Sequence, residues 1–399
     1  AGQDSITFAN NLAASNTITL SGARIDASNK NITIDASNIT GGMTVDGDQS
    51  SVIFYAESAT LSFTSMIITN GDAGFNSDGN SALEVSSSSL TVSNSVFSNN
   101  YGIFSGVGLS AKNASTVIVS DSTFSNHSGS SAIALNSASS MTLSNSVVTG
   151  NLDGSISVGG SSSLSVSNSS FVANYGSNGG AIVAFNSTAS LSNSTLSNNS
   201  AGIGGGIYAS STVLNIYNST VSGNTAAEGG GINVFQSTVT LTNTTLSHNS
   251  LYSYVANRAG GLWASSSTVN LNNSIIANSV IGADCVNSDS ASVTANSATI
   301  IEDGSCGTVR AIDPKLLDLA NNGGSTKTHA LEANSPAINT GDTTVCVSNS
   351  ITHDQRDFLR DDQCDVGSYE FDFTFVPDDS AIFVIPMKDK DDGAIIFEL

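Results

Sequence analysis

Charge is scarce in this sequence, and positive charge is the scarcest. Only 11% of the 399 residues are charged, and 11 Lys and Arg stand against 33 Asp and Glu, which gives a formal net charge of −22. A surface of this sign repels phosphate backbones and anionic lipid headgroups, so nucleic acid and anionic membranes are not expected as partners. Cations and neutral, hydroxyl-rich ligands remain compatible with it.

Long apolar runs are absent as well. No segment approaches the roughly 20 apolar residues of a membrane-spanning helix, and none resembles the apolar region of a secretory signal. The first residues, AGQDSITF, resemble the start of a chain from which a signal has been cleaved after a small residue. We therefore expect a mature exported protein that does not span a membrane.

Proline and cysteine are also few, at four residues each. Four prolines are a small number for a chain so rich in turns. All four cysteines lie in the last third, and their spacing favours the local disulfides Cys285–Cys306 and Cys346–Cys364, although four cysteines allow three pairings. A zinc site is the alternative, but no C-x-x-C spacing supports it. The four histidines show no metal-ligand spacing either.

Glycine, serine, threonine and asparagine dominate what is present. Such a composition is typical of flexible linkers. However, 39% of the residues are apolar, and they recur at regular intervals, which a disordered segment does not need. Within each interval they alternate with Ser or Thr, the period-two pattern of a half-buried strand. The composition and the pattern together indicate an all-β repeat protein.

Asparagine marks a fixed place in each repeat. Two columns recur at intervals of 23 to 30 residues, six residues apart. The first contains Asn94, Asp121, Asn145, Asn168, Asn193, Asn218, Asn243 and Asn273, and the second contains Asn100, His127, Asn151, Asn174, Asn199, Asn224 and Asn249. A repeat near 25 residues that is built from short strands indicates a solenoid. The leucine-rich pattern is missing and a propeller blade needs about 40 residues, so a parallel β-helix with one repeat per coil is predicted.

Asparagine suits a sharp corner between strands for two reasons. It tolerates left-handed backbone, and its amide can be buried while it hydrogen-bonds and stacks on the coil below. We therefore interpret the first column as structural corner residues, with buried amides. The residues to which this prediction applies most directly are Asn145, Asn168, Asn193, Asn218 and Asn243.

The sequence divides into four segments. Residues 1–70 are predicted to form N-terminal coils and a cap, residues 71–284 the regular coils, and residues 285–371 disulfide-bearing C-terminal coils. The last segment, 372–399, contains two apolar strands, 381–387 and 394–399. This strand pair either caps its own helix or adds to a neighbouring copy of the chain, which would give an open head-to-tail filament.

Groups able to perform chemistry are sparse in the regular coils. The acids there are Asp121, Asp153, Glu228 and Asp284, and the cations Lys112 and Arg258 stand alone. Asp153 and Glu228 lie about three coils, or roughly 15 Å, apart, which exceeds the roughly 5–10 Å between the carboxylates of a glycosidase. We therefore expect a protein that is not an enzyme. A polysaccharide-binding or polysaccharide-degrading β-helix is the alternative.

Two acidic features near the C-terminus have structural interpretations. Asp354 and Arg356, in HDQRD, are predicted to form a salt bridge that fastens the last coil, with a catalytic role as the alternative. The acid-rich stretch 378–392 could bind calcium weakly, but a solvated acidic surface is favoured. No cofactor is expected.

Several motifs resemble those of known exported proteins. FSNN (97–100), FSNH (124–127) and GGAI (179–182) resemble the repeats of polymorphic outer-membrane adhesins. The stretch DPKLLDLANNGGSTKTHALEANSPAINTGD (313–342), followed by DQRDFLRDDQCDVGSYEF (354–371), resembles the C-terminal coils of bacterial extracellular β-helix proteins of the choice-of-anchor type. The resemblance implies a right-handed parallel β-helix that a bacterium exports to its surface or surroundings. It implies an adhesive or structural role there, with glycans, the cell surface or other copies of the chain as partners.

Overall fold

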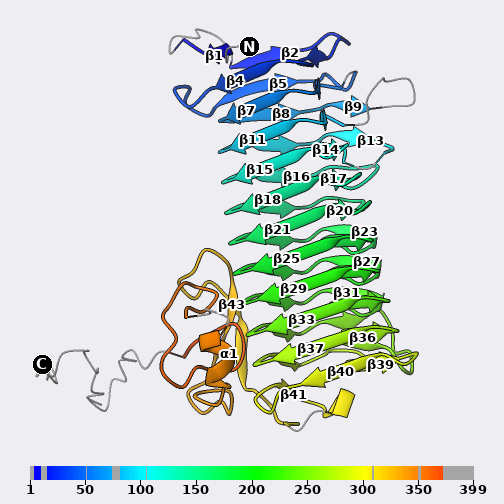
Figure 1. Cartoon of the computed structure of the whole chain (residues 1–399), viewed down its shortest axis with the longest axis vertical. Coiled ribbons are helices and arrows are strands. Elements are labelled where there is room, and N and C mark those ends of the chain that lie inside the picture. Colours follow the sequence, from blue (N-terminus) through cyan, green and yellow to red (C-terminus); the bar gives the residue numbers. More distant parts are fainter. Residues whose placement is uncertain are drawn as a thin grey trace, which may run out of the picture.

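The chain winds into a stack of coils, each made of three short strands that meet at sharp corners (Figure 1). The structure is a computed structural model, and it describes residues 4–9, 16–50, 52–73, 81–104, 106–307, 310–348 and 352–371. Most coils contain about 25 residues. The prediction of an all-β, right-handed parallel β-helix is confirmed.

Three long parallel sheets run the length of the stack. Sheet A contains β1 (Asp4–Thr7), β4 (Asn31–Asp35), β7 (Thr60–Thr64), β11 (Ser89–Ser93), β15 (Thr116–Ser120), β18 (Ser140–Ser144), β21 (Ser163–Ser167), β25 (Thr188–Ser192), β29 (Val213–Tyr217), β33 (Thr238–Thr242), β37 (Thr268–Asn272) and β40 (Ser292–Ala295). Sheet B contains β2 (Thr17–Thr19), β5 (Met43–Asp46), β8 (Met66–Thr69), β12 (Val96–Ser98), β16 (Thr123–Ser125), β19 (Val147–Thr149), β22 (Ser170–Val172), β26 (Thr195–Ser197), β30 (Thr220–Ser222), β34 (Thr245–Ser247), β38 (Ile275–Ala277) and β41 (Ile300–Ile301).

Sheet C is the third wall of the solenoid. It contains β3 (Ile25–Asp26), β6 (Phe54–Glu57), β10 (Leu83–Ser86), β14 (Leu109–Lys112), β17 (Ile133–Leu135), β20 (Ile156–Val158), β24 (Ile182–Phe185), β28 (Ile207–Ser210), β32 (Ile232–Phe235), β36 (Ala259–Ser265) and β39 (Ala283–Ser288). Short parallel strands extend the turn between sheets B and C in some coils. They are β9 (Asp72–Ala73), β13 (Tyr101–Gly102), β23 (Tyr175–Asn178), β27 (Ser200–Ile203), β31 (Thr225–Glu228) and β35 (Ser250–Leu251).

The core lies inside the coils, where apolar side chains stack on the same position of the next coil. Leu214 pairs with Val239 in register, and Ile216 pairs with Leu241; all four are fully buried. Higher in the stack, the rings of Phe97 and Phe124 lie parallel with their centroids 4.7 Å apart. A single coil leaves these faces open, so each coil is stabilised chiefly by its neighbours.

The second asparagine column forms a buried hydrogen-bond ladder. The side-chain amide of Asn174 donates to Oδ1 of Asn199 at 2.9 Å and to the carbonyl of Val148 at 2.9 Å. Asn199 makes the corresponding bonds to Asn224 and Phe171. Each amide therefore satisfies polar groups of neighbouring coils in a place that water does not reach.

The first asparagine column behaves differently from the prediction. Its members adopt left-handed backbone, for example φ 49° at Asn145 and φ 48° at Asn193. However, Asn145 is exposed and Asn168 and Asn193 are half-buried. The buried ladder at this corner is made by the following serine, because the N–H of Ser146 donates to Oγ of Ser169. The corner conformation, rather than a buried amide, accounts for Asn at these positions.

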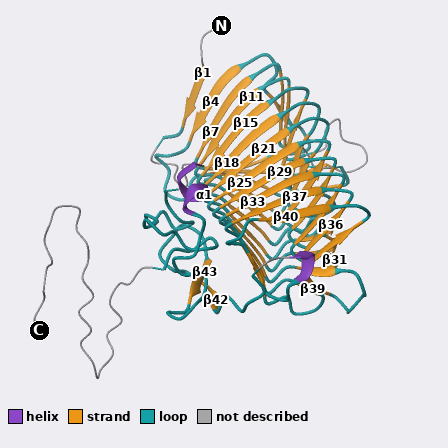
Figure 2. Cartoon of the chain, turned by 60° about the horizontal axis from the view of Figure 1, so that its bottom comes forward, coloured by secondary structure: helices purple, strands orange, loops and turns teal. Residues whose placement is uncertain are grey.

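The chain leaves the solenoid after β41 and doubles back beside it (Figure 2), where it forms hydrogen bonds to strands of sheet B. The predicted C-terminal coils, 285–371, therefore end near residue 301. The part that follows, residues 310–348 and 352–371, is here named the C-terminal cover. It contains the antiparallel pair β42 (Leu316–Ala320) and β43 (Thr328–Leu331) and the short helix α1 (Thr343–Ser348). A 3-10 turn, Ser305–Gly307, precedes it.

The C-terminal cover is fastened to the outward face of sheet B by polar contacts. Thr220 donates to Oε1 of Gln355 at 2.7 Å, and Ser222 lies 2.8 Å from Nε2 of His329. The cover also buries two corner residues that were predicted to be buried, Asn218 and Asn243. The amide of Asn218 donates to the carbonyl of His353. In these coils, burial of the corner asparagines depends on a segment far away in the sequence.

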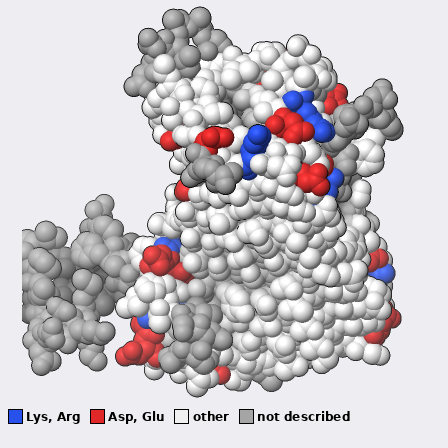
Figure 3. Space-filling view, turned by 45° about the horizontal axis from the view of Figure 1, so that its top comes forward, with Lys and Arg blue, Asp and Glu red and all other residues white. Residues whose placement is uncertain are grey.

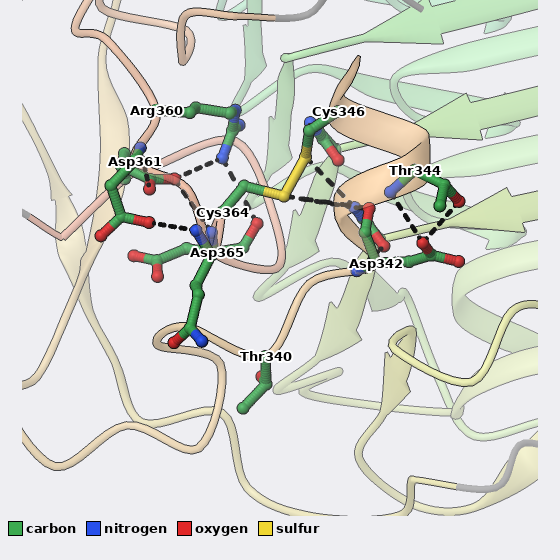
Figure 4. The surroundings of a disulfide bond; sticks show 12 residues. Thr340, Asp342, Thr344, Cys346, Arg360, Asp361, Cys364 and Asp365 are labelled. Carbon is green, nitrogen blue, oxygen red and sulfur yellow. Dashed lines mark hydrogen bonds and ion pairs between the residues drawn. A yellow bond between two sulfur atoms is a disulfide. The ribbon is translucent and has the colours of Figure 1, made fainter. Parts of the chain in front are cut away.

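Two disulfides are present, with the predicted pairing Cys285–Cys306 and Cys346–Cys364. The first joins the last strand of sheet C to the 3-10 turn. The second closes the C-terminal cover beside α1, next to Asp342 and Arg360 (Figure 4). The predicted strands 381–387 and 394–399, with the filament contact proposed for 373–399, lie outside the described residues. Among the described residues, no helix is long and apolar enough to cross a membrane.

Replacing a ladder asparagine is expected to destabilise the solenoid. Asn199→Ala leaves buried backbone and amide groups without partners, and we expect a loss of about 2–3 kcal/mol in the free energy of unfolding. Asn145→Gly is the matched control, because glycine adopts left-handed backbone readily, and it should change stability by less than about 1 kcal/mol. Urea unfolding followed by circular dichroism measures both. Equal losses in the two variants would contradict this account of the ladder.

The histidine in the ladder is expected to make the solenoid sensitive to acid. Burial lowers the pKa of His127 from 6.5 to about 4, so the unfolded chain binds its proton more readily than the folded chain. Stability should therefore decrease as pH falls from about 6.5 towards 4, by up to about 3 kcal/mol from this residue. Burial lowers the pKa of His329 to about 4 as well, so His127→Asn should reduce the decrease in stability over this pH range without abolishing it, in urea unfolding at a series of pH values. An unchanged profile would argue against His127 as the source.

Candidate functional site

Charged side chains gather on the upper coils, whereas the middle coils are nearly bare of them (Figure 3). The register of sheet C explains one such group, because Asp26 pairs with Tyr55 and Tyr55 pairs with Glu84 on successive strands. We name the group the sheet C cluster. It consists of Arg24, Asp26, Tyr55, Glu57, Glu84 and Lys112.

Strand alternation turns these side chains outward. In β6, Phe54 and Ala56 are buried in the core, so Tyr55 and Glu57 point to the other face. The same alternation in β10 and β14 places Glu84 and Lys112 on that face. The cluster therefore rests on regular, hydrogen-bonded strands, which hold functional groups more rigidly than loops do.

Opposite charges are in contact within the cluster. Nζ of Lys112 lies 2.8 Å from Oε1 of Glu84, whose side chain is only 5% exposed. The guanidinium of Arg24 lies 4.2 Å from the centre of the Tyr55 ring and 3.5 Å from Oδ2 of Asp26. The hydroxyl of Tyr55 donates to Oε2 of Glu57 at 3.4 Å. Tyr55 thus lies between a cation on its ring and a carboxylate at its hydroxyl.

The surroundings determine the protonation of these groups. Partial burial, followed by the negative charges of Glu57 and Glu84, raises the pKa of Tyr55 above 10. Hydrogen bonds from Ser28, with a smaller contribution from Arg24, lower the pKa of Asp26. The phenol of Tyr55 is therefore protonated at neutral pH, and the exposed side chain of Glu57 lies beside it. This combination can donate and accept a proton within one site.

The cluster also contains two exposed acids on neighbouring strands. Glu57 lies one coil and two residues from Asp26, which places their Cα atoms about 8 Å apart. In the regular coils, Asp153 and Glu228 belong to different parts of the stack. Asp153 instead accepts a hydrogen bond from the N–H of Gly129.

The two cations expected to stand alone both have partners. Lys112 pairs with Glu84, as described above, and Arg258 pairs with Glu228 at 2.9 Å while its guanidinium lies over the Trp263 ring. Glu84 belongs to residues 71–284 but lies before Asn94, the first residue of the aligned asparagine column, and it was not included among the acids of the regular coils. Aligning YAES (55–58) with EVSS (84–87) and SAKN (110–113) would have placed Tyr55, Glu84 and Lys112 on one face.

Asp354 and Arg356 form an ion pair of 2.7 Å that is almost completely buried. The Arg356 guanidinium also lies 3.7 Å from the centre of the Tyr369 ring. The pair is located in the C-terminal cover on the side of the solenoid, not in its last coil. Across the described ranges, no group of three His, Cys, Asp or Glu residues is placed to hold a metal ion.

Comparisons with known proteins concern the fold. Residues 75–213 match the family model described as "Right handed beta helix region". No curated protein matches the chain. Two solved structures are similar along most of its length. The crystal structure of pectate lyase Pel9A has 18% identity and a TM-score of 0.45, with 93% of this chain and 86% of that chain covered.

The second structure is an arginine-to-alanine mutant of the PL6 family alginate lyase AlyGC. It has 14% identity and a TM-score of 0.37, and the match covers 95% of this chain but 58% of the lyase. Both structures are polysaccharide lyases, and this finding corrects the expectation that the protein is not an enzyme. That expectation rested on the acids named in the regular coils, and it did not consider Glu84 or the earlier residues Arg24, Asp26, Tyr55 and Glu57. At identities this low, the similarity concerns the fold alone and identifies no functional residue in this chain.

Removing one partner of the Lys112–Glu84 pair is expected to be costly. Lys112→Met removes the ammonium group that contacts Glu84 in a nearly buried place, so we expect a loss of about 2–3 kcal/mol in the free energy of unfolding. The double variant Lys112→Met, Glu84→Gln removes both charges and should recover most of the loss. Denaturant unfolding of the three chains measures the effect. A double variant less stable than Lys112→Met would show that the pair is not the cause.

Proposed function

We propose that the protein is an exported, polysaccharide-degrading β-helix that cleaves its substrate at the sheet C cluster. One observation carries this proposal: Tyr55 places a protonated hydroxyl 3.4 Å from the exposed carboxylate of Glu57, beside the guanidinium of Arg24. Glu57 is positioned to take a proton from the sugar or from water, and Tyr55 to give one to the departing oxygen. Arg24 and Lys112 offset two of the three acids of the cluster, Asp26 and Glu84, with which they pair.

Three further features support the proposal. The cluster lies on the outward face of sheet C at its first strands, so a chain-like substrate can extend from it along the strands that follow. Neutral, hydroxyl-rich ligands are compatible with a net charge of −22, and the outward Ser and Thr residues can hydrogen-bond to hydroxyls. The two disulfides are typical of an oxidising compartment, which agrees with a protein that acts outside the cell.

Cleavage assays test the proposal directly. The protein is incubated with a panel of neutral and uronate-containing polysaccharides, and both reducing ends and unsaturated products are measured. We expect the wild-type chain to cleave at least one substrate, and Tyr55→Phe and Glu57→Gln to lower kcat by about 10²–10⁴.

The matched control is Tyr217→Phe, because this tyrosine points outward from β29 of sheet A. It should leave kcat unchanged. Reducing ends with unsaturated sugars would identify elimination, and reducing ends without them would identify hydrolysis. No cleavage across the panel, or full activity in both cluster variants, would overturn the proposal.

A further inference from the structure

Below the sheet C cluster, one row of outward side chains alternates between large and small. The register runs from Phe185 to Ser210, then to Phe235 and finally to Ser265, one residue per coil. Phe185 and Phe235 are 37% and 36% exposed, although both belong to regular strands. Single exposed apolar residues are normal on a protein surface, but these two Phe residues lie in the same row, two coils apart, and together form a larger apolar feature on this face.

We call the exposed rings of Phe185 and Phe235 the two platforms. The first platform, Phe185, is held rigidly. The Tyr208 ring lies against Phe185 with centroids 5.3 Å apart and the ring planes at 67°. This edge-on contact fixes the Phe185 ring and leaves part of its surface open. Tyr208 belongs to the neighbouring row, in register with Val183 and Asn233. The platform therefore needs little reordering when a ligand binds, which favours affinity.

The spacing of the two platforms selects the ligand. Phe185 and Phe235 lie two coils apart, or roughly 10 Å. One coil corresponds to about the length of one pyranose ring in an extended chain, so two coils correspond to a disaccharide. In a flat-ribbon glycan, in which successive rings are turned over, every second ring presents the same face. Such a chain can place alternate rings on the two Phe residues and the ring between them over Ser210.

The same row leads upward to the proposed cleavage site. It continues through Gly159, which lies next to Phe185, and reaches Lys112 and Glu57 on higher coils. Lys112 is about three coils, or roughly 15 Å, above Phe185. The residues between are small or polar, so a glycan lying along the row meets no bulky obstacle. A chain bound on the platforms would reach Lys112 about three rings away and Glu57, two coils higher, about five rings away.

We infer that Phe185 and Phe235 form a stacking track for an extended, flat-ribbon β-linked polysaccharide that lies parallel to the solenoid axis. The inference rests on the proposed function for the direction of the chain, and it adds the class of substrate and the residues that select it. The C–H groups on the apolar faces of the sugar rings pack on the electron-rich faces of the aromatic rings. The sugar hydroxyls stay in contact with water and with serine. A helical α-linked glucan does not match the two-coil period.

Binding measurements test the track separately from cleavage. The chain carrying Tyr55→Phe serves as background so that ligands stay intact during calorimetry. We expect it to bind cellohexaose or chitohexaose, and Phe185→Ala and Phe235→Ala each to raise the Kd roughly tenfold. Tyr217→Ala, an outward aromatic of sheet A, is the matched control and should leave the Kd unchanged. Maltohexaose should bind at least tenfold more weakly than the flat ligands.

The outcomes of the two proposals can be told apart. Failure of the background chain to bind either flat hexasaccharide, equal binding of maltohexaose, or an unchanged Kd in both Phe variants would overturn the track. If the wild-type chain cleaves a polysaccharide while the Phe variants bind normally, the track is wrong and the proposed function stands. If no polysaccharide is cleaved but the Phe variants lose binding, the track stands and the cleavage site is wrong. Circular dichroism of the variants confirms that the solenoid is intact.

Discussion

Register between neighbouring coils is the constraint on which the rest of this structure depends. Each inward side chain, such as Leu241, is buried only because the same position of the next coil is also apolar. The Asn174–Asn199 hydrogen bonds fix that register, because a slip of one residue would break the amide ladder and turn the apolar residues outward. Once the coils are in register, any outward position becomes a straight row along the axis. The charged cluster and the Phe185–Phe235 track are both consequences of this geometry.

Much of the fold follows from local pattern in the sequence. Three patterns are enough to specify the coils: period-two alternation, a repeat near 25 residues and two asparagine columns. They suffice because each coil makes the same contacts with its nearest neighbour. The disulfide pairing also followed from short separations along the chain. The buried amide was predicted for the wrong asparagine column, and this error has a physical cause. Asparagine is favourable at a sharp corner in both columns, and the columns differ only in how deeply the side chain is buried. Asn145 is at the surface of its turn, whereas Asn174 points into the core.

The parts that the sequence did not predict involve contacts between distant residues. Nothing local to residues 310–371 indicates that they leave the solenoid and cover sheet B, because the decisive contacts, such as Thr220 to Gln355, link segments more than a hundred residues apart. The candidate site was missed for a related reason. Arg24, Tyr55 and Lys112 are far apart in the sequence and lie in coils of 27 to 29 residues, so an alignment limited to the regular repeats did not place them together.

The C-terminal cover has a consequence for how the molecule forms. Gln355 reaches back to Thr195, 160 residues earlier, and to Thr220 in the next coil. The cover therefore has no surface on which to assemble until those coils exist, whereas each coil needs only the one before it. Folding should therefore proceed in order from coil to coil. The contact between Gln355 and Thr195 should form last, because it closes the longest loop in the described part of the chain. The lower coils are then tied into one cooperative unit, while the upper coils, which carry the charged cluster, remain free to open one at a time.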